Sequence, residues 1–503
     1  CLYAHAITMT APGHATLLTG CNPRRSGIVG NDFYDRSIGK QIYATEDTAG
    51  VLSPRNLRVP TIGDVMKRSS PLSKVIGIAL KDRAAILMSG QTANYALWLN
   101  EKSKNLGSSA HYATPKWLRD FNAQHPLSSY AGTTWNALQA KPQLPDPREV
   151  QQRLQTLKPG EDPSKVLPPL TVSQRISMTD DVPWEGSFPG GGNSFPHTIP
   201  SVASKEFIDA FCCTPASIEW IMEAARTCIT NEKLGNDDAT DVLCVGISTT
   251  DEVGHLFGPN SREMKEILIS ADKSLAEFVD FLDKEIGRDD YELVLCSDHG
   301  VAEVPENMMM NGMGMGRLTR KSIDSAMMAP YQRFAPLAVS GDNNAPTPGF
   351  IKRFIPPFIF VDSAAVRPIA ADFAAACDSV VVALRAMRGI GCAITLRDVL
   401  THKRPASIDE HTFECIVQSV DPQRSGDIIV FPTRGWLFGS KITTHGTPYE
   451  YDQHVPLVFL GAHLQPATVS TRVSPADIAP TLAKQLGLKL GDIDGTVLDL
   501  ENK

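Results

Sequence analysis

The sequence lacks several features that mark special classes of protein. Among its 503 residues, no apolar run approaches the ~20 residues needed to cross a bilayer; runs such as 241–247 and 455–461 are far shorter. It also lacks an excess of positive charge, since 48 Lys and Arg oppose 56 Asp and Glu, for a net charge of −8. A chain with this charge has no overall attraction for nucleic acid or an anionic membrane. We therefore expect neither as a partner.

The cysteines and the start of the chain lack familiar signatures. The ten cysteines are scattered, with no zinc-ribbon spacing. Cys244 and Cys296 lie in apolar runs, where a small buried thiol is the expected role. The chain opens at Cys1 rather than at Met and shows no signal segment. From this we expect a chain that is truncated at its N-terminus.

Apolar strand patterns alternate with helix patterns along much of the chain. Strands are expected at 74–80, 241–248, 292–296, 427–431 and 455–460. Helices are expected at 12–18, 207–227, 261–286 and 475–486. This alternation predicts an α/β fold with a mostly parallel central sheet and helices on both faces. The strands at 427–431 and 455–460 and the last helix are expected to close this core.

Two segments interrupt what we interpret as a single catalytic α/β domain over residues 1–503. Residues 101–205 are polar and rich in Pro and Gly, which predicts a loop-rich insertion with Trp117 and Trp135 as anchors. Residues 303–350 are rich in Met, Gly and Pro and are expected to be irregular. With the strands and the helix (368–387) expected within 351–425, they form a candidate cap subdomain at 303–425.

Asp and His residues follow the predicted core strands. Asp251 and His255 follow the strand at 241–248, Asp298 and His299 follow the strand at 292–296, and His445 precedes the last strand. The carboxyl ends of parallel strands meet at one edge of a sheet. Carboxylate oxygens and imidazole nitrogens suit zinc. Each pair alone equally fits an N-cap Asp beside a surface His; three such groups together favour a metal site.

Thr10 lies where a predicted helix begins. Pro12 suits the first turn of a helix, which places Thr10 at its amino end. There the helix dipole and free N–H groups favour negative charge. A metal ion beside Thr10 would complete its activation as a nucleophile. The alternative is an ordinary N-cap threonine.

Four separated motifs carry a family resemblance. They are TxTAPGHATLLTGCNPRRSGIVGNDFYD, DEVGH, SDHG and THGTPYEYDQHVPLVFLG, in this order. With them the sequence resembles the alkaline phosphatase superfamily over nearly the whole chain. Within that superfamily it is similar to the branch of threonine-nucleophile alkaline phosphatases and type I phosphodiesterases–nucleotide pyrophosphatases. The resemblance implies an enzyme, periplasmic or secreted, that hydrolyses small-molecule phosphate esters through a phospho-threonine at a site with two Zn²⁺.

The resemblance also implies roles for individual residues. Thr10 matches the nucleophile, and Asn31 matches the Asn that holds a phosphoryl oxygen. The ligands of one zinc match Asp251, His255 and His445, and ligands of the other match Asp298 and His299. His14 and His454 are expected to have supporting or packing roles rather than to be ligands.

The sequence departs from the family pattern before Thr10. Relatives have a further zinc-binding Asp at the end of a first core strand, whereas none of the nine residues preceding Thr10 is Asp or Glu. We therefore expect the first core strand to be missing and the second zinc site to be incomplete. Cys21 begins a C-x-P-x-R pattern found in sulfatases, but there Leu-Thr-Gly follows the pattern, and here it precedes Cys21. The sulfatase interpretation is therefore disfavoured.

Lys81 and Arg83 favour phosphate monoesters over diesters. They end the strand at 74–80, and residues i and i+2 of an extended chain lie on the same side. Both could reach one phosphoryl group, although such a triplet alone also fits a solvated turn. Lys-Asp-Arg at this place resembles the signature of the threonine-type monoesterases. The alternatives are a phosphodiesterase or nucleotide pyrophosphatase, a non-catalytic phosphate-binding relative and, least favoured, a phosphomutase.

Overall fold

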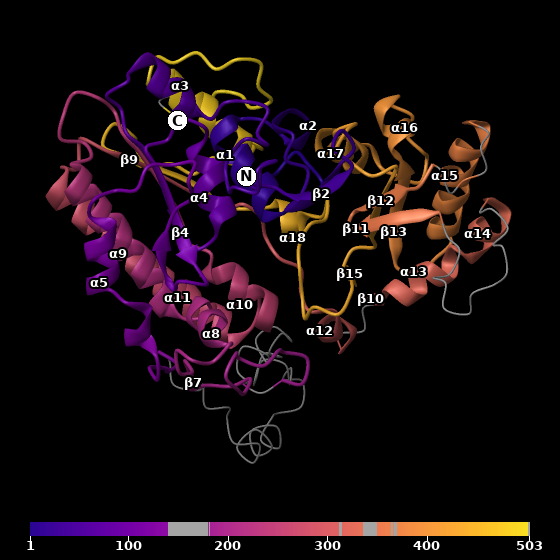
Figure 1. Ribbon diagram of the computed structural model, residues 1–503, viewed down its shortest axis with the longest axis horizontal. Coiled ribbons are helices and arrows are strands. Elements are labelled where there is room, and N and C mark those ends of the chain that lie inside the picture. The colour runs from indigo at the N-terminus through magenta and orange to yellow at the C-terminus, as the bar shows by residue number, and fades with distance from the viewer. Residues whose placement is uncertain are drawn as a thin grey trace, which may run out of the picture.

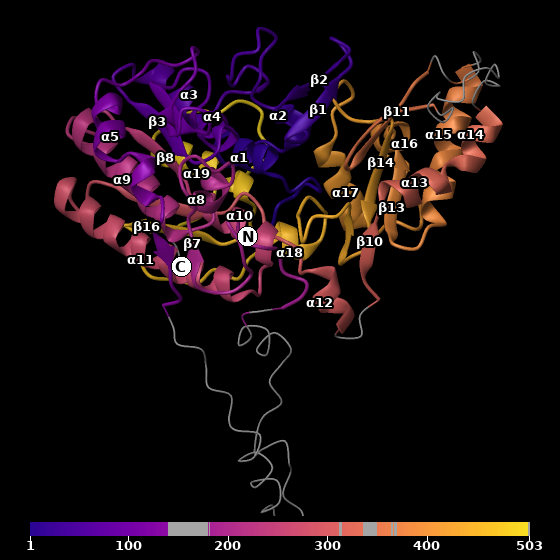
Figure 2. The same ribbon diagram turned by 60° about the horizontal axis from the view of Figure 1, so that its bottom comes forward.

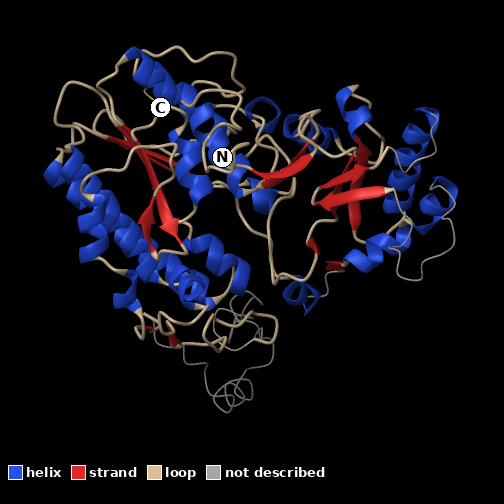
Figure 3. Ribbon diagram, viewed as in Figure 1, coloured by secondary structure: helices blue, strands red, loops and turns tan. Residues whose placement is uncertain are grey.

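The computed structural model describes residues 1–138, 180, 182–310, 314–334, 350–363, 366 and 370–500. Two parts lie side by side, a larger α/β core and a smaller part that we call the cap, which comprises the described residues of 320–432 (Figure 1). Helices and strands are mixed in both parts (Figure 3). Within the described residues, no helix combines the length and apolarity needed to cross a membrane.

The main core sheet has the strand order β5-β4-β3-β8. Its strands are β3 (Val75–Ala79), β4 (Tyr95–Asn100), β5 (Asn105–Gly107) and β8 (Val242–Gly246). β3 runs parallel to both β4 and β8, and β4 pairs antiparallel with β5. All five residues of β3 are buried, as expected of a central strand whose two faces are covered. The predicted strands at 74–80 and 241–248 are therefore confirmed, and two of the three pairings in this sheet are parallel.

A second pair of core strands carries the end of the chain. β9 (Glu292–Cys296) pairs antiparallel with β16 (Leu457–Gly461). Both strands were predicted, but their antiparallel pairing was not. Among the described residues, β9 does not pair with β8, and all five residues of β9 are only half-buried. The absence of a first core strand stays a prediction.

Helices cover both faces of the core sheet, as predicted (Figure 1). One face packs on helices that include α9 (Pro215–Glu232) and α11 (Arg262–Glu285), around Ile76, Ile78 and Leu97. On the opposite face lie α1 (Thr10–Thr19), α4 (Asp82–Ser89) and α19 (Ile478–Gln485), around small residues such as Ala79 and Ala96. The other core helices and short strands are α2 (Pro23–Ser26), α3 (Ile62–Ser69), α5 (Leu118–Gln124), η1 (Leu127–Tyr130), β6 (Thr134–Trp135), β7 (His197–Thr198), α8 (Phe207–Cys212), α10 (Thr249–Phe257), α12 (Pro305–Met310), α18 (Glu450–Gln453) and η3 (Pro475–Asp477).

Several predicted boundaries differ from the structure. The helix expected over 207–227 is two helices, because Pro215 begins α9 and interrupts the backbone hydrogen bonds after α8. Residues 303–350 contain α12, β10 (Gly316–Leu318), α13 (Arg320–Ala326) and α14 (Met328–Phe334), so the expectation of an irregular segment was wrong there. β10 pairs with β15 (Trp436–Phe438). Of the 101–205 insertion, residues 139–179 and 181 lie outside the described residues, while Trp117 and Trp135 are buried.

The cap is built on a four-stranded antiparallel sheet of order β11-β12-β14-β13. Its elements are β11 (Ile351–Ile355), β12 (Phe358–Val361), α15 (Ala370–Arg385), β13 (Ile390–Thr395), α16 (Leu396–Leu400), α17 (Glu410–Ser419) and β14 (Ile428–Pro432). The strand predicted at 427–431 is β14, and its assignment to the core was wrong. An apolar run indicates that a strand is buried, but it does not indicate which sheet the strand joins.

A hairpin of β1 (Asp32–Asp35) and β2 (Lys40–Tyr43) lies between the core and the cap in both views (Figures 1 and 2). The ring of Tyr34 meets that of Phe360 edge-on at 5.3 Å. Arg36 donates a hydrogen bond to Asp427 at 2.9 Å. The hairpin therefore connects the two parts of the molecule.

Candidate active site

Thr10 lies at the amino end of α1, as predicted, and is the first residue of that helix. Met9 before it is extended, and the Thr10 residue is only 3% exposed. It lines a cavity of about 740 Å³ at the edge of the core sheet. Six of the other predicted site residues line the same cavity: Asn31, Lys81, Arg83, Asp251, His255 and His445.

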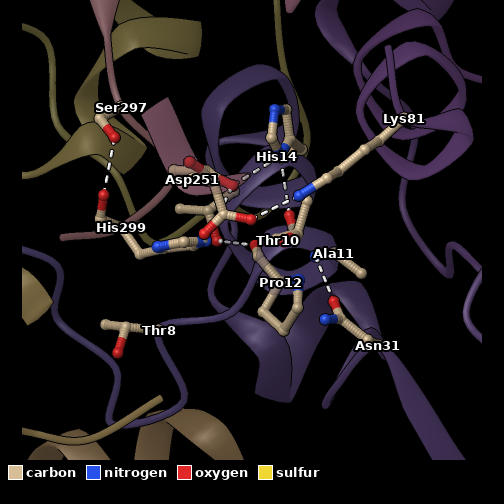
Figure 4. Close-up of polar contacts among 12 residues, drawn as sticks. Thr8, Thr10, Ala11, Pro12, His14, Asn31, Lys81, Asp251, Ser297 and His299 are labelled. Atoms are coloured by element: carbon tan, nitrogen blue, oxygen red, sulfur yellow. Dashed lines mark hydrogen bonds and ion pairs between the residues drawn. The ribbon is translucent and has the colours of Figure 1, made fainter. Parts of the chain in front are cut away.

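Asn31 is fixed on the first turn of α1. Its side-chain oxygen accepts a hydrogen bond from the backbone N–H of Ala11 at 2.8 Å (Figure 4). This bond satisfies one free N–H of the helix terminus and orients the amide. The amide nitrogen of Asn31 is then the group available to donate a hydrogen bond to an anion beside Thr10.

Three metal-type ligands converge from two distant segments. Asp251 and His255 lie one turn apart on α10, and His445 comes from the loop that precedes α18. Asp251 Oδ1 is 3.4 Å from His255 Nε2 and 3.5 Å from His445 Nε2. One ligand atom from each residue lies within 4.8 Å of the others, so the three could hold one cation.

Backbone carbonyls set the orientation of the imidazoles. The Nδ1 atoms of His255 and His445 lie 2.9 Å from Thr443 O and 2.7 Å from Thr8 O. His299 makes the same kind of contact to Gly300 O at 2.9 Å. A carbonyl can only accept, so each Nδ1 carries a proton, and in the neutral imidazole the Nε2 lone pair is then free for a cation.

Asp298 and His299 lie against the first turn of α1. His299 Nε2 and His14 Nδ1 both lie 3.2 Å from Asp298 Oδ2, and His14 Nδ1 is 2.8 Å from Thr10 O. A Cβ at Gly13 would overlap the carbonyl of Asp298, so only glycine allows this approach. The His299 ring stacks on that of His445, with the two ring centroids 3.5 Å apart. These two predicted ligands therefore reach the site, although the described residues offer no third ligand grouped with them.

The surroundings of the site favour ionised carboxylates at Asp251 and Asp298 and neutral imidazoles at His255 and His445. Burial alone would raise the pKa of Asp251, but the Lys81 ammonium and the imidazoles, His445 first, hold it well below its ordinary value. Burial would likewise raise the pKa of Asp298, yet His299 and His14 lower it. Burial lowers the pKa of His255 and of His445. These are the protonation states that bind a divalent cation.

Lys81 and Arg83 reach the cavity by a different backbone route from the one expected. Lys81 occupies the N-cap position of α4 and Arg83 lies in its first turn, so the prediction of an extended chain through both was wrong. Helix formation begins at Asp82, an acidic residue favoured in a first turn. Lys81 Nζ pairs with Asp251 Oδ2 (Figure 4). It also lies 2.8 Å from Glu252 Oε1.

Sequence reasoning missed several residues that support these groups. Glu252 follows the predicted ligand Asp251, and Asp82 lies between Lys81 and Arg83, so their positions were the only available signal. Tyr43, which contacts Arg83, carried no signal at all. Asp452 accepts hydrogen bonds from the hydroxyl and the backbone N–H of Thr447, two residues after His445, at 2.6 and 2.9 Å.

The family described as type I phosphodiesterase / nucleotide pyrophosphatase matches residues 2–455. The chain belongs to this family. The resemblance inferred from the motifs is thereby confirmed. Alkaline phosphatase PhoV of Synechococcus elongatus is 31% identical over 519 residues, which cover 99% of this chain and 85% of PhoV.

Two further comparisons extend this family assignment. Alkaline phosphatase PafA of Elizabethkingia meningoseptica is 28% identical over 500 residues, which cover 96% of this chain and 83% of PafA. The crystal structure of wild-type PafA superposes with a TM-score of 0.80 at 27% identity, over 99% of this chain and 90% of that one. The alkaline phosphatase-like α/β fold predicted from the sequence is therefore confirmed.

The donor set fits a divalent cation. The site brings together three imidazoles whose Nδ1 atoms contact backbone carbonyls, and two ionised carboxylates. His299 Nε2 is buried and makes no hydrogen bond among the described residues, which leaves it available as a ligand. Family and donor set together indicate a metal-dependent site.

Proposed function

We propose that this protein is a phosphate monoester hydrolase of the alkaline phosphatase type, with Thr10 as its nucleophile. The observation that carries the proposal is the composition of one cavity. A hydroxyl at a helix tip lines this cavity together with a three-residue cation-binding group and two cationic side chains, Lys81 and Arg83. Such a site suits a small phosphate ester with high negative charge.

Two Zn²⁺ ions are the proposed cofactors. Asp251, His255 and His445 would hold one, and Asp298 and His299 would contribute to the other. Neutral imidazole nitrogens with carboxylate oxygens are a donor set that zinc favours. When bound, the two ions would lower the pKa of the attacking hydroxyl and neutralise charge on the phosphoryl oxygens.

The chain's own residues would carry substrate through two displacements. Thr10 Oγ attacks phosphorus in line, and the bond from phosphorus to the leaving alcohol breaks as that of phospho-Thr10 forms. Asn31 donates from its amide to a phosphoryl oxygen, and its bond to Ala11 keeps that amide in place. Water then attacks the phospho-threonine, which releases phosphate and regenerates Thr10.

Lys81 and Arg83 support a preference for monoesters. A monoester dianion has one more charged, non-bridging oxygen than a diester. Burial opposes the charge of both side chains, but neighbouring carboxylates raise the pKa of Lys81, and Tyr43 and Asp82 raise that of Arg83, so both stay cationic. Each contact that strengthens in the transition state is worth about 2–4 kcal/mol.

A substrate comparison tests this function. We expect turnover of an aryl phosphate to exceed that of a bis-aryl phosphate, and Lys81→Ala with Arg83→Ala to lower the monoester rate at least ~100-fold more than the diester rate. Arg68→Ala, on the exposed side of α3, is the matched loss of a cation and should change neither rate. Faster hydrolysis of the diester by the unmodified enzyme would favour a phosphodiesterase instead.

The expected setting follows from the family resemblance. We propose small-molecule phosphate esters as substrates and a periplasmic or secreted location. Zinc content measured with inorganic phosphate release tests the catalytic assignment against a non-catalytic phosphate-binding role. Equal release by the wild type and by Thr10→Ala would exclude Thr10 as the nucleophile.

A further inference from the structure

We propose that Tyr43 is a positioning residue, held by Asp82, that fixes the Arg83 guanidinium for binding the phosphoryl group. This inference rests on the proposed function and deepens it, because it names what gives Arg83 its fixed place. Tyr43 is the last residue of β2, and Asp82 and Arg83 open α4. The contact therefore joins two elements 40 residues apart in the chain.

The direction of the hydrogen bonds is determined by chemistry. Tyr43 Oη donates a hydrogen bond to Asp82 Oδ1 at 2.8 Å, since a carboxylate oxygen accepts. The hydroxyl proton of Tyr43 is therefore committed to Asp82, and its lone pair accepts from Arg83 Nη1. Thr45 Oγ1 donates to the second carboxylate oxygen of Asp82 at 2.9 Å. Asp82 is thus held by two hydroxyls from one segment.

The packing of Arg83 adds to this restraint. Its guanidinium carbon lies 5.3 Å from the centroid of the Tyr43 ring, within the range of a cation–π contact. Arg83 Nη1 is 3.9 Å from Asp82 Oδ1. The Arg83 Nε atom is buried and has no hydrogen-bond partner among the described residues. A buried donor of this kind is costly unless an acceptor, such as a phosphoryl oxygen, arrives.

Tyr43 remains a neutral donor in this arrangement. Burial raises the pKa of its hydroxyl, and Asp82 raises it further, against the opposing effect of Arg83. The hydroxyl therefore keeps its proton at the pH at which the enzyme would work. A phenylalanine at position 43 would keep the ring over Arg83 and remove only this link.

The same hairpin also carries the other phosphoryl-binding group. Asn31 lies immediately before β1, and its backbone oxygen accepts from the N–H of Ala44 at 2.9 Å, directly after Tyr43. The base of the β1–β2 hairpin therefore holds Asn31 directly and Arg83 through Tyr43. A shift of the hairpin would move both groups together, which couples them in binding one phosphoryl group.

Tyr43→Phe in the metal-loaded enzyme tests the inference. We expect kcat/KM for an aryl phosphate to fall about tenfold and inhibition by inorganic phosphate to weaken to a similar degree. Hydrolysis of a bis-aryl phosphate should change less than about twofold, because the diester has one charged oxygen fewer for Arg83 to bind. Tyr34→Phe is the matched control: it removes a hydroxyl from the same hairpin, where the ring packs on Phe360, and should leave all three values unchanged.

Arg83→Ala completes a double-mutant cycle that separates positioning from general damage. With Arg83 absent, Tyr43→Phe should cost less than about twofold further. The inference would be overturned if Tyr43→Phe lowered kcat/KM equally in the wild type and in Arg83→Ala. It would also be overturned if Tyr43→Phe had no effect while Arg83→Ala lowered monoester turnover. Both results would leave the proposed function intact. No loss from Arg83→Ala itself would overturn both.

Discussion

Removing the charge of Lys81 should destabilise the metal-free protein far more than the metal-loaded one. The Lys81 ammonium contacts Asp251 and Glu252, and the side chains of Lys81 and Asp251 are only 16% and 15% exposed. Lys81→Met keeps much of the stem and removes the charge. Without metal, the substitution leaves the Asp251 carboxylate without its cationic partner.

The magnitude follows from the burial of this pair. Breaking a buried ion pair lowers the free energy of unfolding by about 3–5 kcal/mol. Because the side chains of Lys81 and Asp251 are partly exposed, we expect the lower end, about 3 kcal/mol. For 503 residues the unfolding entropy is roughly 1 kcal/mol/K, so Tm should fall by about 3 °C. A divalent cation at Asp251 supplies the missing positive charge, which should reduce the loss to about 1 kcal/mol.

Thermal unfolding of the wild type and of Lys81→Met, with chelator and with saturating zinc, measures the loss of stability without and with metal. By linkage, the difference of about 2 kcal/mol should appear as zinc binding that is about 30-fold tighter in Lys81→Met, measured by competition with a chelating indicator. Equal losses of Tm with and without zinc, together with unchanged zinc affinity, would refute the idea that ammonium and metal share one carboxylate.

Two further predictions concern the tip of α1 and a buried histidine. Gly13→Ala should lower zinc content and reduce kcat/KM at least ~10-fold, because the new methyl overlaps the carbonyl of Asp298. Gly491→Ala is the control, since a Cβ at Gly491 would meet no atom within 4 Å. Equal activities of the two variants would contradict the argument. Burial lowers the pKa of His5 to about 3. In the unfolded chain, His5 takes up a proton near pH 6.5, whereas in the folded protein it stays neutral until the pH approaches 3. The free energy of unfolding therefore falls as the pH drops from 6.5 toward 3. In thermal unfolding between pH 7 and 4, His5→Phe should therefore lose stability more slowly than the wild type, by up to about 1.4 kcal/mol per pH unit, and parallel profiles would contradict this.

The sequence predicted the elements that carry the site because each has a strong local pattern. The apolar run at 74–80 is the fully buried β3. Asp251 and His255 follow β8 and lie close to His445, because the loop that carries His445 returns to the same edge of the sheet. The prediction that Thr10 opens a helix also followed from a local signal, Pro12. Motif spacing therefore located most of the candidate site.

Features that depend on tertiary pairing were beyond the sequence. Nothing in the apolar run at 427–431 distinguishes a core strand from a cap strand, and only pairing with β12 and β13 decides it. Arg83 reaches the cavity from a helix rather than from an extended chain, and its contact with Tyr43 joins separate elements. The pairing of His14 with Asp298 likewise requires the close approach that Gly13 allows.

Trapping the covalent intermediate tests the central claim most directly. The metal-loaded enzyme is mixed with an aryl phosphate, quenched in acid within the first turnover and digested for mass spectrometry. The account predicts phosphate on Thr10 in the wild type and none in Thr10→Ala. Phosphate on a different residue, or rapid hydrolysis by Thr10→Ala, would contradict it.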